Sequence, residues 1–72
     1  MKDKELQGFV LGIGKRIRAF RKEQKMTQLD LGIKSDIEEN AIQRLETGRT
    51  SPTVKTLFKV AKGLGVEVRE LM

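Results

Sequence analysis

The sequence has 72 residues, of which 35% are charged, and its formal net charge is +5. It contains neither Cys nor His, which excludes disulfides, zinc sites with Cys or His ligands and His-based catalysis. No apolar run approaches the roughly 20 residues of a membrane span, and the charged start is unlike a secretory signal, so we expect a cytoplasmic protein that is not an enzyme and holds no cofactor or metal.

A chain of this length forms one small domain, and below roughly 80 residues a core rarely supplies more than about 3–5 kcal/mol. A second copy of the chain is the natural supplement, so we expect a homodimer. The charge is uneven: residues 1–25 and 48–72 carry +5 and +3, whereas residues 26–47 carry −3. This basic balance favours a polyanionic partner.

The first predicted helix covers residues 13–25, because three apolar residues recur there at helical spacing: Ile13, Ile17 and Phe20. Glycines at positions 8, 12 and 14 make the start of this helix uncertain, since each costs roughly 1 kcal/mol in a helix interior. We therefore predict an N-terminal extension over residues 1–12 and a folded domain over residues 13–72.

The second predicted helix begins after Thr27, which is a good N-cap. Asp30 follows three residues later, as in a capping box, and places its carboxylate beside free N–H groups. This helix ends near Ser35, and Asp36 occupies a turn position that favours residues tolerant of left-handed dihedrals. The third predicted helix covers residues 38–46, and Gly48 is suited to its C-terminal cap. Its inward residues are Ala41, Ile42 and Leu45.

Ser51 and Pro52 predict the start of a fourth helix, with Ser as N-cap and Pro in the first turn. Gly65 ends this helix, and its apolar stripe consists of Val54, Leu57, Phe58, Ala61 and Leu64. A short fifth helix follows over residues 66–72. The pattern predicts five helices with short connections and no strand.

Three stretches carry a resemblance that extends from Ile13 to Leu71: KRIRAFRKEQKMTQLDL, AIQRLETG and SPTVKTLFKVAKGLGVEVREL. In this order and spacing they resemble the helix-turn-helix domains of the Cro and phage-repressor type, the XRE family. The resemblance implies an all-α, compact five-helix bundle with a central helix-turn-helix. It also implies a transcriptional regulator, most often a repressor, that binds double-stranded DNA by inserting residues 38–46 into the major groove.

The resemblance also assigns contact roles. Gln28 would bind a phosphate and brace a base-reading side chain, while Thr47 and Arg49 would hold the DNA backbone. The face that meets the major groove consists of Glu38, Glu39, Asn40, Gln43 and Arg44.

The chemistry of this face suits base reading: Asn40 can pair with adenine, Arg44 with guanine, and Glu39 can accept from cytosine. Glu38 and Glu39 depart from the family pattern, because two carboxylates oppose approach to phosphate. One interpretation is discrimination in favour of cytosine, and the other is a surface adapted to a protein partner, as in an antitoxin or an interaction module. Attraction to DNA must then come mainly from basic residues elsewhere, such as Arg49 and the first helix.

Several structural roles follow from the resemblance as well. Arg21 and Glu46 are expected to form a partly buried ion pair. Gly32 would stand where the second and third helices cross, and four apolar residues would lock these helices together: Leu31, Ile37, Ile42 and Leu45.

Leu29 and Ile33 lie one turn apart at positions that the family generally leaves polar. Such exposed apolar residues need a cover, for which the segment before Ile13 and a partner subunit are the candidates. For the homodimer we expect the fourth and fifth helices to form the surface through Val68, Leu71 and Met72, with core closure as the alternative for Leu71. We expect no small-molecule sensor domain in a regulator of 72 residues.

Overall fold

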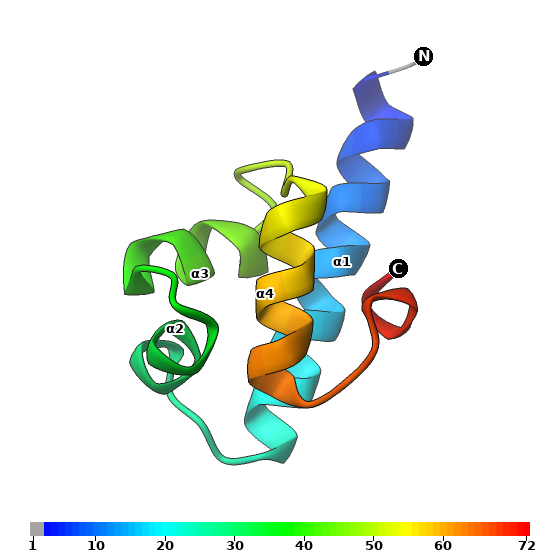
Figure 1. The fold of residues 1–72 in the computed structure, drawn as a ribbon. Helices are drawn as coiled ribbons and strands as arrows, with labels where there is room; N and C mark the ends of the chain where they lie inside the picture. Colours follow the sequence, from blue (N-terminus) through cyan, green and yellow to red (C-terminus); the bar gives the residue numbers. More distant parts are fainter. Residues whose placement is uncertain (1–2) are drawn as a thin grey trace.

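The computed structural model describes residues 3–72 and is helical throughout, with no strand in that range (Figure 1). Its elements are α1 (Asp3–Glu23), α2 (Gln28–Ser35), α3 (Glu39–Glu46), α4 (Val54–Leu64) and η1 (Val68–Leu71). The predicted all-α class is confirmed. The predicted fifth helix is wrong in kind, because η1 is a single turn of 3-10 helix.

Helix α1 begins ten residues before the predicted start and takes up most of the proposed N-terminal extension. Asp3 and Glu5 in its first turn favour a helix N-terminus. Val10 is buried and continues the stripe of Ile13 and Ile17 at helical spacing, so packing continues past the glycines.

Figure 1 shows the first turns of α1 projecting beyond the other helices. Leu6 and Phe9 on these turns are 41% and 49% exposed, while Leu29 and Ile33 are 50% and 71% exposed. The expectation that the segment before Ile13 covers Leu29 and Ile33 is therefore wrong for the described residues.

The caps of α2 agree with the sequence. The Thr27 hydroxyl accepts a hydrogen bond from the Asp30 N–H at 3.0 Å, and the Asp30 carboxylate accepts one from the Thr27 N–H at 2.9 Å. The hydrogen bond from the Thr27 N–H to this carboxylate is the main cause that holds the pKa of the Asp30 carboxyl below its usual range. Asp36 ends the helix in the left-handed region at φ 58°.

Of the caps predicted for the next two helices, the one after α3 is confirmed and the one before α4 is wrong. Gly48, at φ 71°, follows α3 and donates to the Leu45 carbonyl oxygen, as predicted. Helix α4 begins later than predicted, because Thr53 and not Ser51 is its N-cap and accepts a hydrogen bond from the Thr56 N–H at 3.1 Å.

The core lies where α1, α2, α3 and α4 meet, and its fully buried residues are Ile17, Leu31, Ile42, Val60 and Leu71. Val54 and Phe58, predicted as part of the buried stripe of α4, are instead 80% and 55% exposed. Leu71 is fully buried and closes the core, which is the alternative expected for it, and Val68 is half-buried against the core. Met72 alone of that trio is largely exposed. In the described chain, no helix is both long and apolar enough to cross a membrane.

Candidate nucleic-acid interface

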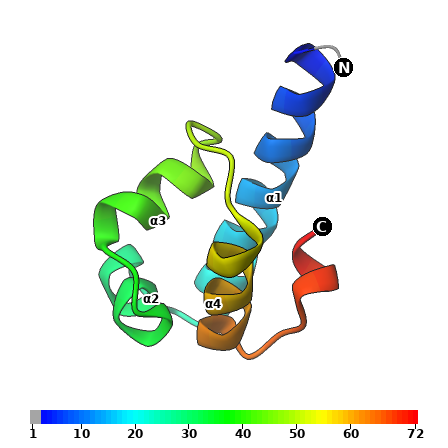
Figure 2. The same ribbon diagram turned by 45° about the horizontal axis from the view of Figure 1, so that its top comes forward.

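Helices α2 and α3 form a compact pair at one edge of the molecule, on the side away from η1 in both views (Figures 1 and 2). A Cβ atom at Gly32 would lie 2.6 Å from the Ile37 carbonyl oxygen, so only glycine permits this approach at the turn. Leu31, Ile42 and Leu45 are buried between the elements and Ile37 is half-buried, as predicted.

The outward face of α3 brings together four predicted contact residues. Asn40, Gln43, Arg44 and Thr47 follow one another at helical spacing and are all exposed. The opposite face of the same helix is buried through Ile42, Leu45 and Glu46. The Thr47 hydroxyl donates to the Gln43 carbonyl oxygen at 2.9 Å, so its proton is already used within the helix.

Three side chains from three helices fix the position of α3. The Arg21 guanidinium donates to both carboxylate oxygens of Glu46, at 2.6 and 3.0 Å, and to the Met26 carbonyl oxygen at 2.7 Å. The Gln28 amide donates to Glu46 Oε1 at 3.2 Å. The expected Arg21–Glu46 pair is confirmed, and Gln28 braces the helix through Glu46 in this structure.

Glu38 and Glu39 stand at the N-terminus of α3 and are exposed. Glu38 is the N-cap, but its side chain makes no capping hydrogen bond. Both carboxylates therefore project from the surface, beside the face formed by Asn40 and Gln43.

Basic side chains lie next to the α2–α3 pair, on α1 and directly after α3. Arg49 is exposed directly after α3. The Leu11 side chain lies against Gly48, and Lys15, Arg18 and Lys22 follow Leu11 at spacings of four, seven and eleven residues. These three exposed cations, the α1 basic stripe, thus share the side of α1 on which Leu11 contacts Gly48.

Two hydroxyl residues that were not among the predicted contacts belong to the same region. Thr50 and Ser51 line a groove together with Arg44 of α3. The available signal was the run of hydroxyl residues directly after Arg49, of a type that commonly binds DNA phosphates. In residues 3–72 no group of three His, Cys, Asp or Glu residues could hold a metal ion.

Comparison with known proteins decides the family. A family model described as helix-turn-helix matches residues 17–71, most of the chain. This protein belongs to the helix-turn-helix family. The match includes α2, the turn and α3, and it excludes the first turns of α1.

Three known proteins are similar to this helix-turn-helix chain. The immunity repressor protein of Bacillus phage phi105 is 37% identical over 60 residues, which are 83% of this chain and 42% of the repressor. The chain thus spans about two-fifths of that protein. The P22 c2 repressor, solved with a synthetic operator, is 33% identical with a TM-score of 0.78, over 83% of this chain and 91% of that one. The restriction-modification controller protein C.AhdI of Aeromonas hydrophila is 25% identical with a TM-score of 0.85. The match covers 88% of this chain and 96% of that protein's chain.

Proposed function

We propose that this protein binds double-stranded DNA at a specific sequence and regulates transcription, as a repressor, by placing α3 in the major groove. The observation that carries this proposal is the exposed face of Asn40, Gln43 and Arg44 on a helix that the Arg21–Glu46 pair holds in place. The similarity to an immunity repressor and to a repressor solved on its operator supports the same function. Such a protein acts without catalysis and in the cytoplasm, where its DNA lies.

Individual contacts divide into two kinds. Asn40 and Arg44 present groups that pair with adenine and guanine, and Glu39 and Gln43 flank them, so this face reads bases. Arg49, Thr50 and the α1 basic stripe present groups that bind phosphate and set register. Attraction comes from the second kind, because the α2–α3 pair itself is acidic.

The test separates these roles. Arg44→Ala should cost about 1–3 kcal/mol of binding and relax preference at one base pair, whereas Arg49→Gln should weaken binding to all sequences and reduce the salt slope by about 1. Lys4→Gln, a charge change at an exposed residue in the projecting first turn of α1, is the control. Equal effects of Arg44→Ala and Lys4→Gln on affinity and base preference would contradict the proposal.

A homodimer completes the function, because two recognition helices about 34–36 Å apart read a palindromic site. We assign the dimer surface to α4, whose Val54 and Phe58 are one turn apart and exposed. The V54S/F58S variant should then sediment as a monomer and lose most of its affinity for a palindrome. A V54S/F58S variant that still sediments as a dimer would show that the dimer interface does not include these residues.

The second candidate function is a protein-interaction module, such as an antitoxin. Glu38 and Glu39 favour it, because carboxylates at the front of α3 repel phosphate. A DNA binder loses affinity steeply as salt rises, through counterion release. Selection on random duplex DNA that enriches no sequence at low salt would favour this alternative.

A further inference from the structure

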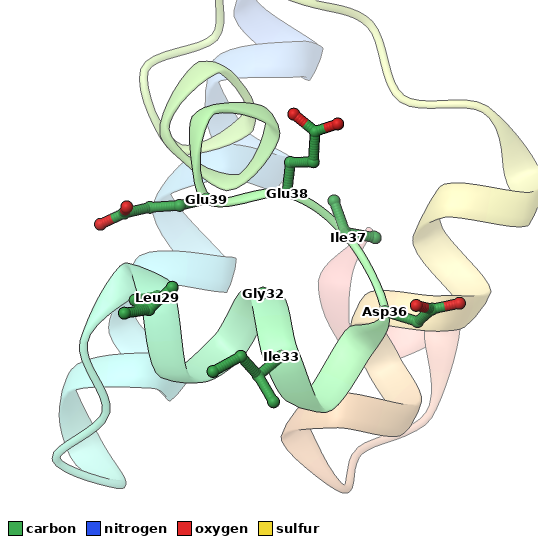
Figure 3. A pocket seen from close by; sticks show the side chains of 7 residues that line it. All are labelled: Leu29, Gly32, Ile33, Asp36, Ile37, Glu38 and Glu39. Atoms are coloured by element: carbon green, nitrogen blue, oxygen red, sulfur yellow. The ribbon is translucent and has the colours of Figure 1, made fainter.

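A groove between α2 and the start of α3 extends beyond the face that we propose reads bases. It is lined by Leu29, Gly32, Ile33, Asp36, Ile37, Glu38 and Glu39. Figure 3 shows the side chains of Leu29 and Ile33 along α2, with the carboxylate of Glu39 at one end of the groove and that of Asp36 at the other. We call these seven residues the α2–α3 groove.

The floor of the groove is apolar and exposed. The side chain of Ile33 is 71% exposed and that of Leu29 is 50% exposed. An apolar pair that lines a groove and is rimmed by charged residues forms the kind of patch that marks a contact site. The first turns of α1 do not cover them, since Leu6 and Phe9 there are exposed themselves.

The rim of the groove is acidic and largely uncompensated. In residues 3–72, neither Glu38 nor Glu39 forms an ion pair within 4.0 Å, and Asp36 has only Lys59, at 3.9 Å. The Asp36 side chain is 97% exposed, so this pair leaves its carboxylate open to solvent. Three carboxylates around an apolar floor thus stand out on a protein of net charge +5.

From this charge pattern we infer that the α2–α3 groove binds an amphipathic segment of a partner protein, with apolar residues for Leu29 and Ile33 and Lys or Arg for the three carboxylates. Burial of the apolar pair supplies affinity, while the carboxylates select a basic segment and orient it. The contact can be tested without DNA, because Leu29 and Ile33 lie outside the face that we propose reads bases, whereas Glu38 and Glu39 belong to both surfaces.

The probe is a synthetic helical peptide of Leu, Lys and Ala, with Leu at every third or fourth position. Matched peptides replace Lys by Glu or Leu by Ala. Fluorescence anisotropy of the labelled peptides, without DNA and at two salt concentrations, gives their affinities for the intact protein. The Leu–Lys peptide should bind at least about tenfold more tightly than either matched peptide, since each of them lacks one half of the complementarity.

Variants then locate the contact. L29S/I33S should weaken binding of the Leu–Lys peptide at least about fivefold, and E38Q/E39Q should weaken it and reduce its salt dependence. The controls are L6S/F9S, an exposed apolar pair on α1, and E5Q/E23Q, two exposed carboxylates on α1; neither should change the affinity. Circular dichroism confirms that each variant is folded.

Three outcomes would overturn the inference. The Leu–Glu peptide could bind as well as the Leu–Lys peptide, which would remove the charge argument. L29S/I33S could bind the Leu–Lys peptide with unchanged affinity, which would place the contact elsewhere. Sedimentation could show self-association that L29S/I33S abolishes, which would make a second copy of the chain the occupant. All three measurements are made without DNA, so a failure of the proposed DNA binding would not change their outcome.

Discussion

Arg21, Gln28 and Glu46 show how single residues set the geometry of the candidate interface. Each comes from a different helix, and their hydrogen bonds converge on one carboxylate. Arg21 and Glu46 are only 8% and 7% exposed, so each ion has lost most of its hydration and depends on the other. The pair therefore positions α3 and makes the fold sensitive to loss of either partner.

The Glu46→Ala variant should lose about 3–5 kcal/mol of unfolding free energy, because Arg21 would stay buried without a counter-ion. Glu67→Ala is the matched control, since Glu67 is exposed and its ion pair with Arg69 is solvated, although Glu67 also takes part in the capping box of η1. Thermal denaturation followed by circular dichroism compares the two. Equal shifts in Tm would rule out a structural role for the Arg21–Glu46 pair.

Replacing two glycines of α1 by Ala should have opposite effects on stability. A Cβ atom at Gly8 would meet nothing within 4 Å, so Gly8→Ala should raise the unfolding free energy by up to roughly 1 kcal/mol. A Cβ atom at Gly14 would collide with the carbonyl oxygens of Leu45 and Glu46, so Gly14→Ala should force α1 away from α3 and destabilise the protein. Urea denaturation gives both values. A Gly14→Ala protein as stable as the Gly8→Ala protein would contradict the close approach of these helices.

At the scale of elements, α1 divides into an anchored and a projecting part. Val10 is its first buried residue, at 6% exposed, and everything described before it is exposed. Removal of residues 1–8 should therefore change the unfolding free energy by less than about 1 kcal/mol. Chemical denaturation of the truncated chain measures this. A loss of cooperative unfolding would show that the projecting turns hold the fold together.

The capping box of α2 carries a pH dependence. Because the pKa of Asp30 is lower in the folded chain than in an unfolded one, its contribution to stability is present above the usual Asp range and disappears as the pH falls through the lowered pKa. Wild type should therefore exceed Asp30→Asn in stability at neutral pH, with the difference shrinking in acid. Urea denaturation over a pH series tests this, and a difference that is independent of pH would contradict it.

Local signals explain which elements the sequence predicts well. Helix α2 and the turn at Asp36 follow from Thr27, Asp30 and dihedral preference, which act within a few residues. The start of α1 and the exposure of Phe58 depend on which distant helices pack where, and no local pattern encodes that. Helical spacing is enough to predict that Asn40, Gln43 and Arg44 share one face of α3, which we propose reads bases. The basic residues of α1 were also evident in the sequence, but their position relative to α3 follows only from the contact of Leu11 with Gly48.

The whole molecule combines an acidic α2–α3 pair with basic surroundings. Because the net charge of +5 arises outside this pair, the proposed function assigns approach to DNA and recognition of bases to different parts of the chain. Replacing Lys15 and Arg18 together by Gln should weaken binding to every duplex and lower the slope of affinity against salt by about 2, with base preference unchanged. A filter-binding series at several salt concentrations provides the slope. A change in base preference would place these side chains in the groove instead of on phosphate.

The central claim is that α3 reads a specific duplex sequence as part of a dimer. Selection from random double-stranded DNA, sequenced after binding at two salt concentrations, tests it most directly. We predict enrichment of one palindrome whose half-sites lie one helical turn apart, with weaker recovery at the higher salt. Recovery of unenriched DNA at both salt concentrations would contradict sequence-specific binding and favour a protein partner for this surface.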